Sequence, residues 1–188
     1  GQGGVFSFER SNWWDAVTAE ALAVRERFGL MDLSTFAKFD VKGKDAHAFL
    51  DRICANKIPT KQGGIMLGHL LNENGFIESE ITVTRLADDH FYVLSAAVAQ
   101  QHDFDQLSWR KKDNEQVMIT DVTDAFGVLV LAGPKSRDVL SQVCKDDLGK
   151  WLKGSVAEVA GVKGVRLLRV NYVGELGWEL HTPMAEMP

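Results

Sequence analysis

The chain has 188 residues, of which 45% are hydrophobic, and its formal net charge is −5. A chain of this length can bury a core and usually forms one or two domains. Its lysines and arginines are scattered without any basic run, which argues against nucleic acid or an anionic membrane surface as a partner. The longest apolar stretch, around residues 126–132, is too short to span a bilayer.

The cysteines and the two ends of the sequence indicate the cellular compartment and whether the chain is a fragment. Cys54 and Cys144 lie outside any CxxC or Cys/His cluster, which argues against a disulfide framework or a zinc site, so no metal is predicted. No secretory signal opens the chain, which favours the cytoplasm, or the mitochondrial matrix if the source is eukaryotic. Because the chain begins with Gly1 and ends at Pro188 directly after a strand-like segment, we interpret it as a fragment.

The first half of the chain alternates helical and strand patterns. Apolar residues recur every three or four positions over 13–28 and 44–54, which predicts two amphipathic helices, and strict alternation over 36–41 predicts a strand between them. An Asn-Gly pair at 74 and 75 readily adopts positive φ, so it predicts a hairpin between strands at 67–71 and 76–85.

The second half also contains both helices and strands, but they do not alternate strictly as in repeated βαβ units. This favours antiparallel α+β layers over a doubly wound parallel sheet. The predicted elements are a strand at 90–95, a helix at 96–111, strands at 117–122 and 125–132, a helix from Pro134 to about 143, and a hairpin of 165–172 with 177–182 around Gly174.

Glu78 and Glu80 are the first candidate pair. They lie two residues apart on the predicted strand, so their side chains share one face. If that face lines a pocket, desolvation and mutual repulsion would raise the pKa of at least one of them and create a proton carrier near neutral pH. The alternative is a solvated face of a half-buried strand, which is the usual setting of carboxylates.

The segment 172–179 is the second candidate. Its two glycines permit a tight turn, and Tyr172 and Glu179 lie on opposite sides of that turn. A carboxylate that accepts paired N–H donors suits an aminopyrimidine edge, and an aromatic ring suits its face. The alternative is an ordinary hairpin whose aromatic side chains pack on the core.

Other catalytic signatures are missing from the sequence. No two of the five histidines are spaced as metal ligands, and His69 and His181 are expected in strands as core or pocket-lining residues. There is no G-x-S-x-G, G-x-G-x-x-G or P-loop motif.

An ordered set of motifs resembles the aminomethyltransferase module of the dimethylglycine and sarcosine dehydrogenase family, over nearly all of residues 5–183. The motifs are SNWW at 11–14, VRERFGLMDLS at 24–34, FAKF at 36–39, LLNENG at 70–75 with TVTR at 82–85, and YVGELGWEL at 172–180.

The resemblance implies a function and a site. A flavin domain carrying FAD, expected before Gly1, would oxidise the N-methyl group of dimethylglycine or sarcosine to an iminium. The module itself, which is similar to the glycine-cleavage T-protein, would bind tetrahydrofolate and capture the one-carbon unit as 5,10-methylene-tetrahydrofolate. The resemblance places Tyr172 and Glu179 at pterin-binding positions, Thr82 and Leu67 at neighbouring pocket positions, and Glu80 at the key acidic position beside the folate nitrogens.

Glu80 is also the departure from the family pattern, which has aspartate at that position. The carboxylate is retained but reaches one methylene further, and a shift of about 1 Å can matter to a proton carrier. We interpret Glu80 as a working variant that holds or takes the proton released when the folate nitrogen attacks the iminium carbon.

The family fold implies two ferredoxin-like lobes around a cavity, followed by a smaller β domain. By analogy, one lobe would comprise about 5–58 with 124–188, and the other would be the insertion 59–123. The β domain would follow Pro188, so the fragment alone is not expected to have full catalytic competence.

Two further functions stay open. One is a folate-binding or scaffold module without chemistry of its own, and the other is a folate-dependent demethylase of a sulfonium substrate. The linker-like SNWW segment favours the amine-oxidising family over the sulfonium demethylase.

Overall fold

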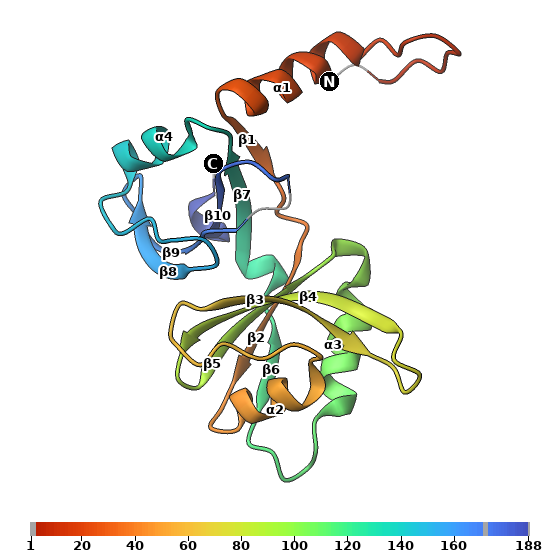
Figure 1. Cartoon of the computed structure of the whole chain (residues 1–188), viewed down its shortest axis with the longest axis vertical. Coiled ribbons are helices and arrows are strands. Elements are labelled where there is room, and N and C mark those ends of the chain that lie inside the picture. Colours follow the sequence, from red (N-terminus) through yellow and green to blue (C-terminus); the bar gives the residue numbers. More distant parts are fainter. Residues whose placement is uncertain (1–2, 171–172, 188) are drawn as a thin grey trace.

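Two antiparallel sheets of five strands each build the protein. The computed structural model describes residues 3–170 and 173–187. Sheet A has the strand order β1-β7-β10-β9-β8 and sheet B the order β3-β4-β5-β2-β6 (Figure 1). The α+β prediction with antiparallel pairing is therefore confirmed.

The bounds of the elements follow the predicted patterns closely. The strands of sheet A are β1 (Gly29–Asp32), β7 (Phe126–Ala132), β8 (Gly154–Val159), β9 (Val162–Leu168) and β10 (Gly177–Pro183). Those of sheet B are β2 (Ala37–Lys42), β3 (Ile65–Leu71), β4 (Ile77–Ala87), β5 (His90–Ser95) and β6 (Met118–Asp121). The helices are α1 (Trp14–Glu26), α2 (Ala46–Ile53), α3 (Gln100–Arg110) and α4 (Ser136–Val143), with short 3₁₀ turns η1 (Ala97–Ala99), η2 (Thr123–Ala125) and η3 (Met184–Glu186). Strands β1 and β8 were not predicted.

The chain crosses between the sheets after β1 and again before β7. The predicted lobe boundary near residue 58 is wrong, because β2 pairs with β5 and β6 and so belongs with α2 to sheet B. The 3₁₀ turn η2 (Thr123–Ala125) leads into β7 at the second crossing, and the predicted boundary near 123 stays a prediction. An alternating pattern of apolar and polar residues shows that a segment is a strand but not which sheet it joins. The first lobe boundary therefore could not be predicted from this pattern.

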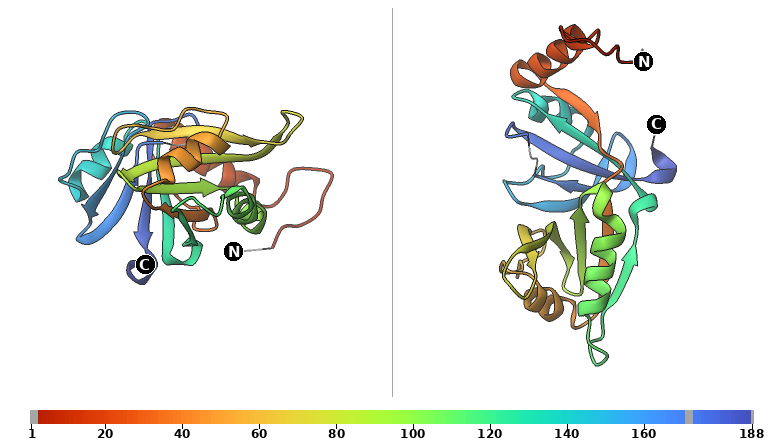
Figure 2. Two further views of the ribbon diagram at one scale, coloured as in Figure 1. Left: turned by 90° about the horizontal axis from the view of Figure 1, so that it is seen from below. Right: turned by 90° about the vertical axis from the view of Figure 1, so that its right-hand side faces the viewer.

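Sheet B buries one face under α2 and α3. The apolar face of α2 carries Phe49, Leu50 and Ile53, and these pack with Phe39 and Val83 in one core cluster. The other face of sheet B turns toward sheet A (Figure 2).

Sheet A is covered on one face by α4, where Trp178 and Leu140 are fully buried. Its opposite face meets sheet B in a smaller cluster that includes Tyr92 and Leu168. The inner faces of the two sheets therefore meet each other, and the helices α2, α3 and α4 lie outside.

The hairpin between β3 and β4 confirms the Asn-Gly prediction. The Asn72 side-chain oxygen accepts hydrogen bonds from the backbone N–H groups of Asn74 and Phe76, both at 3.0 Å. Gly75 has φ of 82°, in the left-handed region that glycine adopts without strain. This turn fixes the register of β3 against β4.

Helix α1 lies at the far end of the molecule beside the N-terminal segment (Figure 1). None of its residues is buried, and Trp14, Val17 and Leu22 remain exposed. The apolar pattern therefore predicted the helix correctly, but among the described residues few side chains pack against its apolar face.

Candidate functional site

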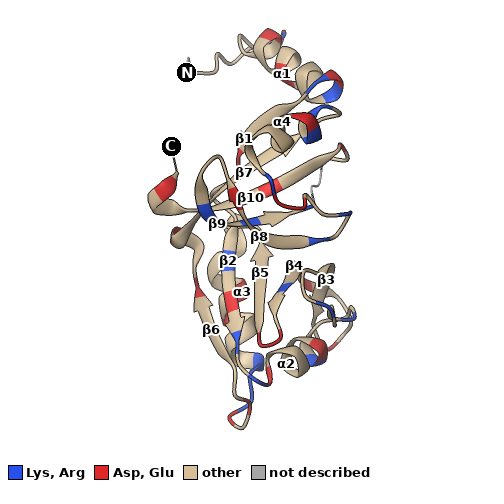
Figure 3. Cartoon of the chain, turned by 90° about the vertical axis from the view of Figure 1, so that its left-hand side faces the viewer, with Lys and Arg blue, Asp and Glu red and all other residues tan. Residues whose placement is uncertain are grey.

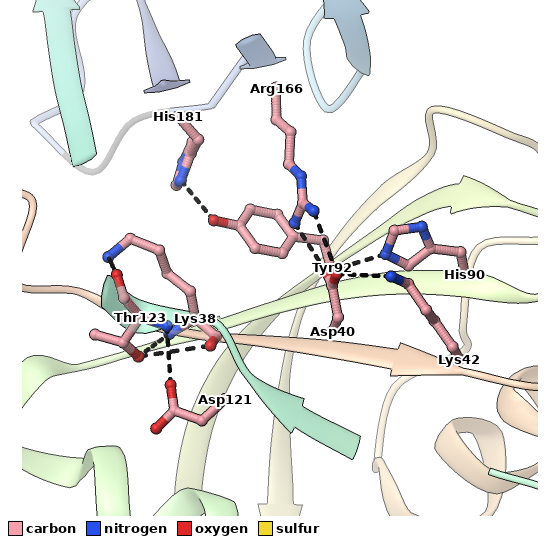
Figure 4. Close-up of polar contacts among 9 residues, drawn as sticks. All are labelled: Lys38, Asp40, Lys42, His90, Tyr92, Asp121, Thr123, Arg166 and His181. Atoms are coloured by element: carbon pink, nitrogen blue, oxygen red, sulfur yellow. Dashed lines mark hydrogen bonds and ion pairs between the residues drawn. The ribbon is translucent and has the colours of Figure 1, made fainter. Parts of the chain in front are cut away.

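The inner faces of the two sheets carry buried polar side chains. On sheet A, Glu179 and His181 lie two residues apart on β10, and Arg166 is paired across from His181 on β9. On sheet B, Tyr92 projects toward them from β5. Because strand side chains alternate between faces, these residues form one internal polar layer between the sheets. Figure 4 shows its members Tyr92, Arg166 and His181.

A hydrogen-bonded chain runs from Glu179 through His181 to Tyr92. His181 Nε2 lies 3.1 Å from Glu179 Oε2, and its Nδ1 lies 3.0 Å from the Tyr92 hydroxyl. Glu179 is only 6% exposed and His181 is fully buried. Burial lowers the pKa of His181, which the Glu179 carboxylate partly opposes, and burial raises the pKa of Tyr92 far above its usual range. His181 and Tyr92 are therefore neutral at neutral pH.

Arg166 joins the two sheets through an ion pair. Its guanidinium donates to both carboxylate oxygens of Asp40, at 2.8 and 3.3 Å. The guanidinium also lies between two aromatic rings, 4.2 Å from the centroid of Tyr92 and 4.1 Å from that of Phe126. This bidentate and stacked geometry is the one that suits arginine and not lysine.

Asp40 is the centre of the charged part of this layer. His90 Nε2 lies 3.0 Å and Lys42 Nζ 3.1 Å from its carboxylate oxygens, in addition to Arg166. Burial alone would raise the pKa of Asp40, but the hydrogen bonds from Arg166 and the close contact with His90 outweigh it and hold the pKa well below its usual range. The carboxylate is therefore ionised at neutral pH.

Lys38 binds both of the segments that cross between the sheets. Its fully buried ammonium donates to the carbonyl oxygens of Ser34 and Phe36, both at 2.8 Å, and to that of Thr123 at 3.0 Å. Desolvation lowers its pKa, and nearby carboxylates oppose that effect. The role of Lys38 is to hold the two crossings together.

Glu80, Thr82 and Leu67 lie on the neighbouring strands β3 and β4. Leu67 is paired across from Thr82, and Glu80 across from His69. By alternation they lie on the same face of sheet B as Tyr92, because Thr82 is paired with Leu94 two residues from Tyr92. Three predicted site residues thus share the sheet face that turns toward Glu179.

The surroundings of Glu80 differ from what the pocket hypothesis required. Its side chain is 83% exposed, and its Oε2 lies 3.7 Å from His69 Nε2. Its predicted companion Glu78 lies 3.7 Å from His102. Among the described residues, the solvated-face interpretation fits Glu80 better than a closed pocket.

Tyr172 lies outside the described residues, so its predicted place beside Glu179 stays a prediction. The loop that follows it is described from residue 173 onward, and Gly174 has φ of 80°, as the turn prediction required. Glu175 in that loop accepts a 2.7 Å hydrogen bond from Arg25 of α1. The described part of the loop is thus tied to α1.

A separate apolar cavity of about 360 Å³ lies on the α4 side of sheet A. Leu180 and Thr182 of β10 line it, together with Leu131 and Leu140. Glu179 and His181 occupy the alternate positions of the same strand, so they point to the other face. This cavity is therefore distinct from the polar layer that holds the candidate residues.

Metal and membrane features are missing from the part of the chain that the structure describes. Across 3–170 and 173–187, no three histidine, cysteine or acidic side chains gather as a metal ion would need. Over the same ranges, no helix has the length and apolar character to cross a membrane. Acidic and basic positions are interspersed over both sheets and form no basic stripe (Figure 3).

Most of the polar layer was not predicted from the sequence. Lys38 and Asp40 were visible as polar positions of an alternating strand, and that pattern ordinarily marks a solvated face. His181 was expected as core or pocket lining, and it is buried. The missing signal was that the polar faces of two sheets would meet each other.

The fold and this polar layer define an α+β domain of two antiparallel sheets, and comparisons identify its family. The GCVT N-terminal domain family matches residues 3–188. Dimethylglycine dehydrogenase, mitochondrial, of Rattus norvegicus is 36% identical over 183 residues, which are 93% of this chain and 21% of that protein. Sarcosine dehydrogenase, mitochondrial, of Homo sapiens is 30% identical over 188 residues, which are 91% of this chain and 20% of that protein.

A solved structure agrees with these matches. The glycine cleavage system aminomethyltransferase T of Bartonella henselae superposes with a TM-score of 0.81 and 26% sequence identity, over 90% of this chain and 45% of that chain. The chain therefore belongs to the GCVT N-terminal domain family, and it is homologous to enzymes. It spans about a fifth of the length of the dehydrogenases it matches.

Proposed function

We propose that this chain binds tetrahydrofolate and captures the one-carbon unit released by oxidative N-demethylation of dimethylglycine or sarcosine, giving 5,10-methylene-tetrahydrofolate. The observation that carries the proposal is the buried Glu179 carboxylate. His181 contacts Oε2 and leaves Oε1 without a hydrogen-bond partner among the described residues. An acceptor oxygen on a carboxylate residue that is 6% exposed fits a ligand that presents N–H donors, as a reduced pterin does.

The proposed roles follow the family resemblance, and the positions of Glu179 on β10 and of Thr82 on β4 are compatible with them. Glu179 would bind the aminopyrimidine edge, Tyr172 would lie against the ring, and Thr82 and Leu67 would line the neighbouring part of the pocket. Folate supplies the two nitrogen nucleophiles for the transfer. The first adds to the iminium carbon, whose π electron pair returns to the amine nitrogen, and the second bonds to the same carbon as the C–N bond to the demethylated amine breaks and that amine leaves. Glu80, on the same face as Thr82, would hold or take the proton that leaves the first folate nitrogen as its lone pair bonds to the iminium carbon.

The proposed setting is a longer protein. The homologous dehydrogenases are about five times longer than the matched region, which supports a flavin domain with FAD and a further β domain elsewhere in the chain. We place the protein in the cytoplasm of a bacterial source or in the mitochondrial matrix of a eukaryotic one. The names of the two dehydrogenases, both mitochondrial, support the second location. The fold proposed for each sheet with its helices is ferredoxin-like.

Calorimetric titration with 5-formyltetrahydrofolate tests the binding site. We expect saturable binding by the unchanged chain and at least about tenfold weaker binding by Glu179→Ala, which is about 1.4 kcal/mol. Glu179→Gln keeps the shape but places N–H donors toward the ligand, so it should weaken binding similarly. Glu158→Ala, an exposed residue on β8 of the same sheet, is the matched control and should bind as the unchanged chain does.

The outcome distinguishes the proposal from its alternatives. If the folded chain fails to bind, and a longer protein that continues past residue 188 fails as well, the folate site is contradicted. Glu80→Gln then separates a catalytic module from a scaffold in the longer protein. Lost one-carbon transfer with retained folate binding supports catalysis, whereas unchanged transfer removes Glu80 from the chemistry and favours a binding-only module or another proton carrier.

A further inference from the structure

His181 lies between the candidate ligand-binding carboxylate and the second sheet. It contacts Glu179 through Nε2 at 3.1 Å and Tyr92 through Nδ1 at 3.0 Å. Glu179 and His181 belong to sheet A, whereas Tyr92 belongs to sheet B. The imidazole therefore connects the carboxylate of one sheet to the hydroxyl of the other.

One arrangement of protons gives each contact in this chain a donor and an acceptor. We assign Glu179 Oε2 as the acceptor, which places the ring proton on Nε2, pointing at Glu179. Nδ1 is then an acceptor, and the Tyr92 hydroxyl donates to it. Burial lowers the pKa of His181, which is consistent with a neutral ring that carries a single proton.

Tyr92 is itself held in place by its neighbours. The Arg166 guanidinium lies 4.2 Å from its ring centroid and is anchored by the bidentate pair with Asp40. The Tyr92 and His181 rings meet edge to face, with centroids 5.3 Å apart. The orientation of His181 thus depends on side chains from both sheets.

We infer that His181 is a positioning residue that fixes the Glu179 carboxylate so that Oε1 is presented to a pterin-type N–H donor. The Nε2–H group holds Oε2, which removes rotational freedom about the terminal bond of Glu179 before the ligand arrives. Such preorganisation increases affinity because less ordering remains to be done on binding. This inference rests on the proposed folate site and adds to it that the carboxylate is oriented from sheet B through Tyr92.

Two substitutions at the same position test the inference. His181→Gln retains an N–H donor near the place of Nε2, whereas His181→Leu fills similar space without a donor. Titration with 5-formyltetrahydrofolate should show about tenfold or weaker binding for His181→Leu and a markedly smaller loss for His181→Gln. Both variants are first compared with the unchanged chain by circular dichroism and thermal unfolding, so that only folded protein is titrated.

Nitrogen NMR of the labelled protein gives a readout that loss of packing would not mimic. We expect the His181 signals of a neutral ring with the proton on Nε2, and a shift of the Nε2 signal in Glu179→Gln and on addition of the folate. A proton on Nδ1 would overturn the inference. So would an Nε2 signal that shifts neither in Glu179→Gln nor on addition of the folate.

The failure of this inference is distinguishable from failure of the proposed function. If the unchanged chain binds the folate and the two His181 variants lose affinity equally or not at all, the positioning role is wrong and the folate site stands. If the unchanged, folded chain and a longer protein containing it both fail to bind, the folate site is wrong and the inference falls with it.

Discussion

Glu179 and Glu80, the two carboxylates that the sequence singled out, lie in opposite surroundings. Glu179 is 6% exposed, and its oxygen is held by a buried histidine that a tyrosine from the other sheet supports. The Glu80 side chain is 83% exposed, and it lies 3.7 Å from His69. The first carboxylate is already oriented, while the second is free to move in solvent.

This difference separates binding from chemistry. A buried, oriented carboxylate can recognise a ligand without reorganisation, so Glu179 fits a binding role. An exposed carboxylate behaves as in water unless something covers it, so a catalytic Glu80 would need desolvation by the ligand or by another part of a longer protein. Substitutions in the two regions test how much of the free energy of unfolding depends on contacts between the sheets. They also test whether Glu80 contributes to that stability.

The largest effect is expected from Arg166→Met. The substitution removes the bidentate partner of Asp40 and leaves that carboxylate buried beside His90 and Lys42, so unfolding free energy should fall by about 3–5 kcal/mol. Chemical denaturation measures the change. Arg25→Met is the matched control, because the Arg25 side chain in its pair with Glu175 is 77% exposed and the loss should cost less than about 1 kcal/mol.

A second variant separates the ion pair from simple packing. Adding Asp40→Asn to Arg166→Met removes the uncompensated charge and should recover part of the lost stability. If the double variant is less stable than Arg166→Met by the full cost of Asp40→Asn alone, the two residues are not coupled and the inter-sheet role of Arg166 is wrong.

Tyr92→Phe should have the next largest effect. It deletes the hydroxyl that donates to His181 and leaves Nδ1 buried without a donor, so we expect a loss of about 1–3 kcal/mol in unfolding free energy. The same substitution in a His181→Leu background should cost much less, because the acceptor is gone. Equal costs in the two backgrounds would contradict the hydrogen-bonded chain.

The sequence predicted this molecule well where local patterns decide the structure. The Asn74-Gly75 turn and the buried face of α2 were each recognisable within about ten residues, and the structure confirms them. Family motifs added Glu179 and Glu80, which spacing alone could not separate from ordinary strand and turn residues.

The polar layer was less accessible because its members are far apart in the chain. Asp40 and Arg166 are brought together only when two sheets pack, and nothing in the strand pattern of β2 distinguishes a polar face toward water from one toward another sheet. The same limit explains the wrong lobe boundary. Pairing partners are set by tertiary packing and not by the local period of the sequence.

The pH dependence of stability offers a smaller but directional test of His181. Its pKa is lowered from 6.5 by burial, so below about pH 6.5 the unfolded chain binds a proton that the folded chain does not. Stability is therefore retained above that pH and falls as the pH decreases below it, with a slope of at most about 1.4 kcal/mol per pH unit from this group. Denaturation curves from about pH 7.5 to about pH 5 measure it.

The matched variant for this test is His181→Gln, which has no group that titrates in the window. Its curve should lie lower at neutral pH but be flatter by the His181 contribution, since the other histidines are common to both proteins. Equal slopes would mean that His181 takes up its proton in the folded state as readily as in the unfolded state.

Glu80→Gln should have the smallest effect on stability. Its side chain is largely exposed and no buried group among the described residues depends on it, so the change in unfolding free energy should stay within about 0.5 kcal/mol. Glu179→Gln should cost clearly more, because it disturbs the buried pair with His181. Parallel denaturation curves of the two variants make the comparison.

A large loss of stability for Glu80→Gln would show that this carboxylate stabilises the fold, in addition to any role toward a ligand. If instead the chain tolerates the substitution, a defect in one-carbon transfer by the longer protein can be assigned to chemistry and not to misfolding. The stability measurement on the chain itself therefore decides how the activity measurement on the longer protein is interpreted.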